Sequence, residues 1–152
     1  MLRFENFTKN HLDQIDLGYE MPKETKSGFI GNEAYKGVTL FNNDDILAVG
    51  GVHTLWKGVG ECWIMLSKSG RKKPFTVAKY TFVLFDNMIS QENIIRLQAS
   101  IASTDDKALK FAKWLGFEFE GIMRKYGPEG DDYYRVARIT NGSTINSNSR
   151  RW

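Results

Sequence analysis

The stretch Ile94–Phe117, IIRLQASIASTDDKALKFAKWLGF, decides the fold that the sequence predicts. Apolar and polar residues alternate over Ile95–Ile101, which is typical of a strand with one buried face. The alternation gives way to Thr104–Asp106, whose polar and acidic side chains suit the free N–H groups of a helix start. Apolar residues then recur at helical spacing until Gly116, where a left-handed helix end is expected. The stretch therefore predicts a strand, a tight turn and a capped helix.

Composition sets the broad class of the protein. Its 152 residues, 41% hydrophobic and 26% charged, are typical of a soluble globular chain that can form one core. The formal net charge of +3 is too small to indicate nucleic-acid binding by itself. The single cysteine, Cys62, excludes an internal disulfide and suits a reducing compartment. No apolar run is long enough to span a bilayer and the N-terminus lacks a signal-peptide core, so we expect a cytoplasmic protein.

The rest of the chain supplies the other elements of a mixed sheet. Asn42 to Asp45 forms a turn that joins two strands into a hairpin. Gly50-Gly51 predicts a bulge or a close backbone approach. The polar tail over residues 141–152 is expected to be disordered, which leaves residues 1–140 as a single domain. Strands are expected at Leu2–Phe7, Val38–Phe41, Ile46–Trp56, Glu61–Leu66, Phe119–Lys125 and Tyr133–Ile139, with helices at residues 8–17 and 74–90 and a further short one between residues 19 and 36.

Ser67–Lys73, SKSGRKK, is the second informative stretch. It follows a strand and precedes Pro74, a residue suited to the first position of a helix. That helix is expected to bury one stripe, made of Phe75, Ala78, Phe82, Phe85 and Ile89. A basic loop that contains glycine and leads into a helix N-terminus can bind an anion. Such a loop, taken alone, is more often a solvated turn.

Two runs resemble the GNAT superfamily of N-acetyltransferases. Asp105-x-x-Ala108, followed by Leu115-Gly116-Phe117 and Glu120-Gly121, is similar to its second cofactor motif, in which Asn usually stands at position 105 and Tyr at position 112. The resemblance implies an α/β (α+β) fold: a GNAT-like mixed, mostly antiparallel sheet of six to seven strands, flanked by helices, with splayed central strands. The run LAVGG at residues 47–51, with Cys62-Trp63, is most similar to small GNAT-like proteins of tailed phages.

The resemblance also implies acetyl-CoA as cosubstrate, with its pyrophosphate on the basic loop. The superfamily usually shows Gln/Arg-x-x-Gly-x-Gly/Ala there, whereas this chain retains only Gly70 and adds three cations. No metal site is expected. The residues expected to bind the cofactor are Ile64, Met65, Leu66, Ser69, Gly70, Arg71, Lys72, Lys73, Ser103, Asp105, Ala108 and Phe111.

Acetyl transfer to an amine needs a general base whose pKa is tuned towards neutrality. Glu61 stands where several family members carry a glutamate base, although a hairpin-end glutamate in water explains it equally well. His53 on the neighbouring strand is the second candidate, because imidazole ordinarily titrates near neutrality. A lone strand histidine is nevertheless more often a packed or surface residue.

The other chemical roles fall to the backbone and to hydroxyl groups. Backbone N–H groups at Met65 or Leu66 would polarise the thioester carbonyl. Ala112 has no hydroxyl to protonate the leaving thiolate, so Tyr126 or Ser103 would take that role, or the thiolate leaves without a dedicated acid. Cys62 has no obvious His or Asp nearby in the sequence to activate it as a nucleophile and stands in apolar surroundings, so it is interpreted as structural.

The sequence leaves three candidate functions, which we rank from first to third. The first is an acetyl-CoA-dependent N-acetyltransferase acting on an amine of a protein or small molecule. The second is a catalytically silent GNAT-like domain that serves as a phage structural or host-interaction protein, in the host cytoplasm or the virion. The third is a nucleic-acid-binding module, suggested by Arg71–Lys73 with Phe75 and by Arg150–Trp152, though these pairs are short and far apart. The expected partners are a coenzyme A thioester, an unidentified amine acceptor and a homodimer or virion or host protein, with no membrane.

Overall fold

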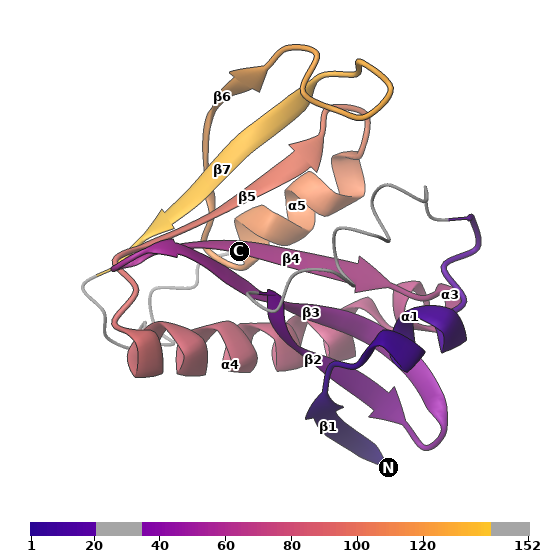
Figure 1. The fold of residues 1–152 in the computed structure, drawn as a ribbon. Helices are drawn as coiled ribbons and strands as arrows, with labels where there is room; N and C mark the ends of the chain where they lie inside the picture. Colours follow the sequence, from indigo (N-terminus) through magenta and orange to yellow (C-terminus); the bar gives the residue numbers. More distant parts are fainter. Residues whose placement is uncertain (21–34, 141–152) are drawn as a thin grey trace. The chain divides into compact units, whose positions relative to one another are not determined.

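The computed structural model describes residues 1–20 and 35–140 (Figure 1). Residues 21–34, within the region of the expected extra helix, and residues 141–152, the expected disordered tail, lie outside them. The sheet has seven strands in the order β1-β2-β3-β4-β5-β7-β6. The pairings of β1 with β2, β2 with β3, β5 with β7 and β6 with β7 are antiparallel, and the pairing of β4 with β5 is parallel. The expected mixed, mostly antiparallel sheet is therefore confirmed. The strands are β1 Leu2–Asn6, β2 Tyr35–Asn42, β3 Asp45–Trp56, β4 Val59–Leu66, β5 Arg96–Ala102, β6 Glu118–Met123 and β7 Tyr133–Ile139.

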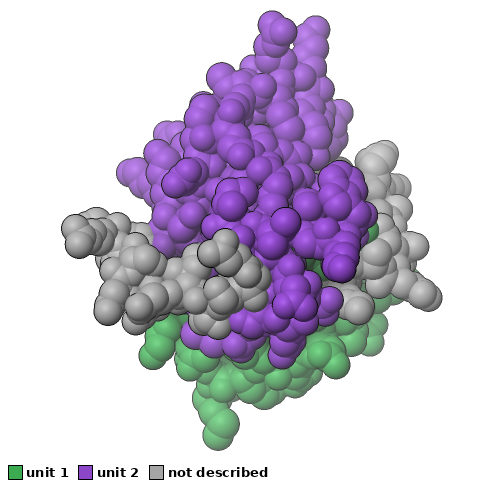
Figure 2. All heavy atoms as spheres, turned by 90° about the vertical axis from the view of Figure 1, so that its left-hand side faces the viewer, with its two compact units in different colours: residues 1–53, 62–81 green, residues 54–61, 82–152 purple. Residues whose placement is uncertain are grey.

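The described helices are α1 Lys9–Gln14, α3 Lys68–Arg71, α4 Pro74–Glu92 and α5 Asp106–Trp114. Among the residues that the structure describes, no helix is both long enough and apolar enough to cross a membrane. The residues group into two compact units, coloured in Figure 2. The first unit contains residues 1–53 and 62–81, and the second contains residues 54–61 and 82–152. The single domain expected over residues 1–140 stays a prediction.

The first unit is built on the β1-β2-β3 antiparallel strands and the short helix α1. Thr8 caps α1 as expected, and its backbone N–H donates to Nδ1 of His11 at 3.2 Å. The helix ends at Gln14 rather than at residue 17, because the backbone at Ile15 is already extended. A hydrophobic cluster fills the unit and consists of Ile15, Leu17, Phe41, Ile46 and Val49, with Phe7, Trp63 and Met65 packed against it.

The glycine pair in β3 has the second of its two expected roles. A Cβ atom at Gly50 would lie 2.9 Å from the carbonyl oxygen of Trp63, so the strand backbones approach too closely for a larger residue. The register shifts opposite Leu40 and Phe41 of β2, where β3 carries one extra residue, Leu47, three positions before the glycine pair. The close approach is therefore confirmed, whereas the bulge of β3 lies at Leu47 and not at Gly50-Gly51, which pair in regular register with Val38 and Gly37.

The second unit contains the stretch that decides the fold. Leu97 and Ile101 of β5 are buried as expected, whereas Ile95 precedes the strand and is 53% exposed. The Asp105 side chain accepts a hydrogen bond from the backbone N–H of Ala108 at 3.0 Å and caps α5. Gly116 takes the expected left-handed conformation, with φ of +94°. Strand, capped helix and glycine exit are thus all confirmed.

Helix α4 departs from the sequence prediction at its first turn. Ala78, Phe82, Phe85 and Ile89 are buried, but Phe75 is 84% exposed. Helical side chains tilt towards the N-terminus, so a large residue in the first turn projects past the end of the helix. The expectation that Phe75 belongs to the buried stripe is therefore wrong.

Candidate functional site

The stretch expected to be a basic loop, Ser67–Lys73, is a helical turn. Ser67 caps α3: its Oγ accepts from the backbone N–H of Gly70 at 2.9 Å and donates to the carbonyl oxygen of Leu47 at 3.2 Å. Ser67 is buried, so these two bonds fix the turn against strand β3. The turn belongs wholly to the first unit.

Gly70 is explained by packing within this turn. The residue is buried, and a Cβ atom there would lie 2.0 Å from the carbonyl oxygen of Leu47. Its backbone N–H is already bound to Ser67. The glycine expected to admit a pyrophosphate is therefore required by the contact with β3, whatever the turn binds.

Replacing Gly70 by alanine is expected to lower the free energy of unfolding by about 1–3 kcal/mol, the usual cost of overpacking a filled site. The added methyl group meets backbone rather than the end of a flexible side chain, so β3 or α3 must shift. A urea denaturation curve would measure the change. Ser69→Ala, in the same turn, is the matched control and should leave the midpoint nearly unchanged.

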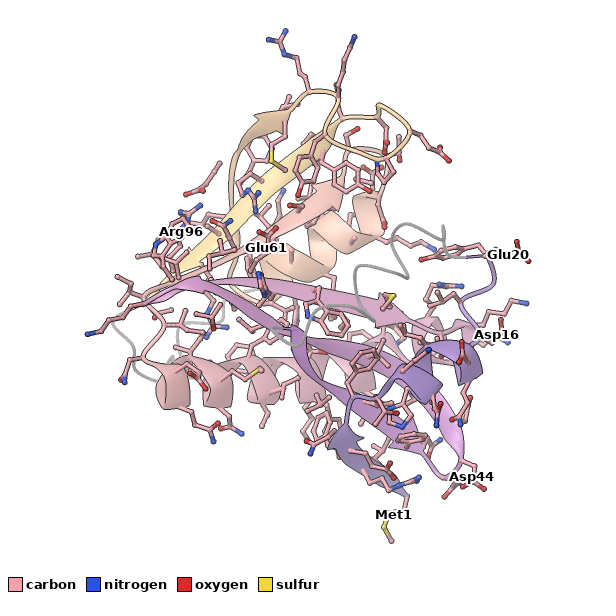
Figure 3. The ribbon with its side chains drawn as sticks, viewed as in Figure 1. Met1, Asp16, Glu20, Asp44, Glu61 and Arg96 are labelled. Carbon is pink, nitrogen blue, oxygen red and sulfur yellow. The ribbon has the colours of Figure 1, made fainter. Side chains whose placement is uncertain are left out.

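Arg71 ties the turn to the chain that follows α1. Its Nη1 donates to the carbonyl oxygen of Leu66 at 3.1 Å and its Nη2 to that of Leu17 at 2.6 Å. The backbone N–H of Lys68 also donates to the carbonyl oxygen of Asp16 at 2.8 Å. Figure 3 labels Asp16 just beyond α1. Since its guanidinium holds two carbonyl groups, Arg71 has a structural role in addition to its charge.

The remaining cations of the turn are exposed. Lys68, Lys72 and Lys73 lie at the surface, and Ser69 is half-buried. Within residues 1–20 and 35–140, none of the ion pairs involves these lysines or Arg71. The turn therefore carries positive charge that no described carboxylate neutralises.

Glu61, labelled in Figure 3, lies in the second unit, where three side chains form hydrogen bonds with its carboxylate. Oε1 accepts from Oγ of Ser100 and from Nη1 of Arg135, each at 3.0 Å. Oε2 accepts from Nε2 of Gln98 at 3.3 Å. Oε1 thus accepts two hydrogen bonds and Oε2 accepts one, so Oε2 keeps one acceptor site that these side chains do not occupy. The same arrangement cross-links β4, β5 and β7.

The partners of Glu61 were not identified from the sequence. Gln98 and Ser100 occupy the polar positions of the alternating pattern in β5, and Glu61 stands opposite Gln98 in the parallel register. Arg135 faces Ser100 in the antiparallel register of β5 with β7. The alternation therefore carried a signal for two partners, while Arg135 could be placed only once strand pairing was known.

A second ion pair, between Arg96 and Glu120, also involves β5. Nη2 of Arg96 is 2.5 Å from Oε1 of Glu120, and Nη1 donates to Oε2 at 3.0 Å. This bidentate contact lowers the pKa of Glu120, with a smaller contribution from the charge of Arg135. The hydrogen bond to Glu120 likewise raises the pKa of Arg96, which therefore keeps its charge. The pair joins β5 to the edge strand β6.

Because the folded-state pKa of Glu120 is lowered, the pair stabilises the fold above the unfolded-state pKa of the carboxyl group, about 4.3. This stabilisation is lost as the pH falls through the lower, folded-state pKa. The unfolding midpoint of the wild-type protein is thus expected to fall more than that of Glu120→Gln between pH 7 and pH 3. The difference is expected to be small, since the pair is partly exposed; equal falls would contradict it.

The other residues expected at the site are distributed over both units. In the first, Ile64, Met65 and Leu66 are half-buried, Met65 packs on the hydrophobic cluster and Cys62 is buried. His53 is half-buried near the end of β3. In the second, Ser103, Ala108 and Phe111 are half-buried, Ala112 is buried, and Tyr126 is exposed with its ring 5.3 Å from that of Tyr133. The described residues contain no group of three or more His, Cys, Asp and Glu side chains that could hold a metal ion.

A model of the acetyltransferase (GNAT) domain matches residues 40–136, more than half of the chain. The chain belongs to the GNAT acetyltransferase family. Membership confirms the expected class, an N-acetyltransferase, and enzymes of this family generally use acetyl-CoA. A search of curated protein sequences found no match.

Solved structures support the same fold. A variant of the spermidine N-acetyltransferase from Vibrio cholerae is similar with a TM-score of 0.71 and 14% identity, over 90% of this chain and 94% of that one. The ribosomal-protein-S18-alanine N-acetyltransferase from Escherichia coli has a TM-score of 0.68 and 16% identity, over 97% and 98% of the two chains. Ard1 from Thermoplasma volcanium has a TM-score of 0.72 and 11% identity, over 91% and 97%. At these identities the likeness shows the fold alone.

Proposed function

We propose that this chain transfers the acetyl group of acetyl-CoA to an amine of a protein or small molecule, with Glu61 as the general base. The observation that carries the proposal is the family match over residues 40–136, which includes Glu61, the basic turn and the helix α5. Both regions that resemble the cofactor motifs lie within it. The splaying of the central strands, which the family fold implies, is part of the proposal.

The groups proposed to bind the coenzyme come from residues 64–73 and from the start of α5. The exposed cations of residues 68–73 would attract the diphosphate. This assignment is supported by the observation that none of them forms an ion pair with a carboxylate in the described parts of the chain. Backbone groups of Ile64, Met65 and Leu66 would bind the pantetheine arm and the thioester carbonyl. At the start of α5, Ser103, Asp105, Ala108 and Phe111 are the further residues proposed to contact the coenzyme.

In the reaction the neutral amine attacks the thioester carbon, the new C–N bond forms and the C–S bond breaks. Glu61, directly or through a water, would take the proton that the amine loses. Tyr126 or Ser103 would protonate the departing thiolate. The names of similar structures suggest two acceptor classes to try, a polyamine and the terminal amine of a protein.

Calorimetric titration with acetyl-CoA, followed by a thiol-release assay with polyamines and with peptides that have free N-termini, tests the proposal. Binding together with acceptor-dependent release of coenzyme A is the expected result. Failure to bind acetyl-CoA at millimolar concentration would overturn it. Hydrolysis without an acceptor serves as the blank.

One observation favours a second candidate, a silent GNAT-like domain in a phage structural or host-binding role. Ala112 is buried and has no hydroxyl, and the Glu61 carboxylate is already engaged by Arg135 and Ser100. The likeness to phage proteins, a cytoplasmic or virion location and a dimer belong to this proposal. The same assays separate the two candidates. A silent domain acetylates no acceptor, whether or not it binds acetyl-CoA, whereas the enzyme releases coenzyme A when an acceptor is present.

A further inference from the structure

The polar groups of the α3 turn divide into fixed and unfixed sets. The Gly70 N–H is bound to Ser67, and the Arg71 guanidinium is bound to two backbone carbonyl groups. Lys72 and Lys73 follow directly, and both are exposed. Neither forms an ion pair with a carboxylate in the described parts of the chain. These two lysines are therefore available to a mobile anion, whereas Gly70 and Arg71 serve the fold.

An exposed aromatic ring follows the two lysines. Phe75 lies in the first turn of α4 and is 84% exposed. Lys79, four residues on and also exposed, shares its helix face, because residues four apart are neighbours on a helix surface. Val77, two residues after Phe75, is buried on the opposite side of the helix. The exposed surface therefore presents the flat apolar ring of Phe75, with Lys72 and Lys73 before it in the sequence and Lys79 after it.

This combination matches one part of coenzyme A better than the others. Aromatic side chains stack on nucleobases, and lysines bind phosphate as point charges. The adenosine end of the coenzyme has both features, since its 3′-phosphate monoester carries about −1.5 to −2 charges near neutral pH. The pantetheine arm has neither a flat ring nor a charge.

We propose that Phe75 stacks on the adenine ring and that Lys72 and Lys73 bind the 3′-phosphate of the coenzyme, with Lys79 adding charge beside the ring. The assignment rests on the proposed function, because it takes the coenzyme as the ligand. It divides the basic stretch between two phosphate groups. Lys68 and Ser69 are left for the diphosphate, and Lys72 and Lys73 recognise the monoester.

Titrations with coenzyme A and with 3′-dephospho-coenzyme A test this division. The wild-type protein should bind coenzyme A at least about tenfold more tightly. The double variant Lys72→Gln/Lys73→Gln should lose that preference and bind both ligands alike. Phe75→Ala should weaken both ligands by about tenfold while keeping the preference. The double variant Lys9→Gln/Lys57→Gln removes the same charge from exposed positions elsewhere and should behave as wild type.

The outcomes separate this inference from the proposed function. Equal wild-type affinity for the two ligands overturns the inference alone, since acetyl-CoA is still bound. No binding of either ligand overturns both. A third arm uses a single-stranded oligonucleotide: if its binding depends on Lys72 and Lys73 while the two coenzyme forms bind alike, the surface serves nucleic acid and the inference is wrong.

Discussion

Replacing Asp86 by alanine is expected to lower the free energy of unfolding by about 3–5 kcal/mol, because it leaves a buried arginine without its counter-ion. Asp86 of α4 and Arg138 of β7 form an ion pair with 2.5 Å between Oδ1 and Nη2. Both residues are buried, Arg138 to 2% exposure. Nη1 of Arg138 also donates to the carbonyl oxygen of Leu115 at 3.2 Å, and its guanidinium lies 5.2 Å from the ring centre of Phe82.

Urea denaturation at pH 7 would measure this loss, and two comparisons establish its cause. Glu120→Gln removes one partner of the partly exposed pair with Arg96 and should cost no more than about 1 kcal/mol. The double variant Asp86→Leu/Arg138→Met replaces both charges by apolar groups and should recover most of the loss. Should Asp86→Ala be as stable as Glu120→Gln, the buried pair does not hold the second unit together.

The sequence predicted the elements whose causes are local. The cap at Asp105, the glycine exit at Gly116 and the proline at the start of α4 each depend on a few neighbouring residues, and all three lie where expected. How far the buried stripe of a helix extends depends less on neighbouring residues, because a side chain is buried only where another element packs against it. Phe75 fitted the helical spacing and is exposed.

The candidate site and the buried ion pair of the second unit depend on pairings between distant residues, which the sequence does not encode directly. The contact of Gly70 with Leu47, the pair of Asp86 with Arg138 and the three partners of Glu61 all join separate strands or helices. Glu61 was predicted to be a base because it is a glutamate at a position where several members of the family carry a glutamate base. Only strand register showed that its carboxylate is held by Arg135.

Replacing Glu61 by glutamine is expected to lower kcat about 10²–10⁴-fold with a competent amine, because the variant keeps the size of the side chain and removes the proton acceptor. The KM for acetyl-CoA should hardly change, since a base faces the acceptor amine. The amide oxygen of glutamine can still accept from Ser100 and Arg135, and the Gln98 amide can turn to accept from the new NH₂ group. The variant should therefore fold, and an unfolding curve checks that it does.

Two control variants decide whether Glu61 acts on the substrate or only on the sheet. Glu120→Gln removes a carboxylate from the neighbouring strands and should leave kcat nearly unchanged. His53→Gln removes the competing base and should have the smaller effect. If His53→Gln abolishes turnover while Glu61→Gln retains it, the base is His53 and Glu61 is a cross-link.

If Ser100→Ala, which removes one donor from the Glu61 carboxylate, leaves stability unchanged but raises kcat, the hydrogen bonds that fix the carboxylate also restrain it as a base. That result would explain how one side chain can cross-link three strands and still accept a proton.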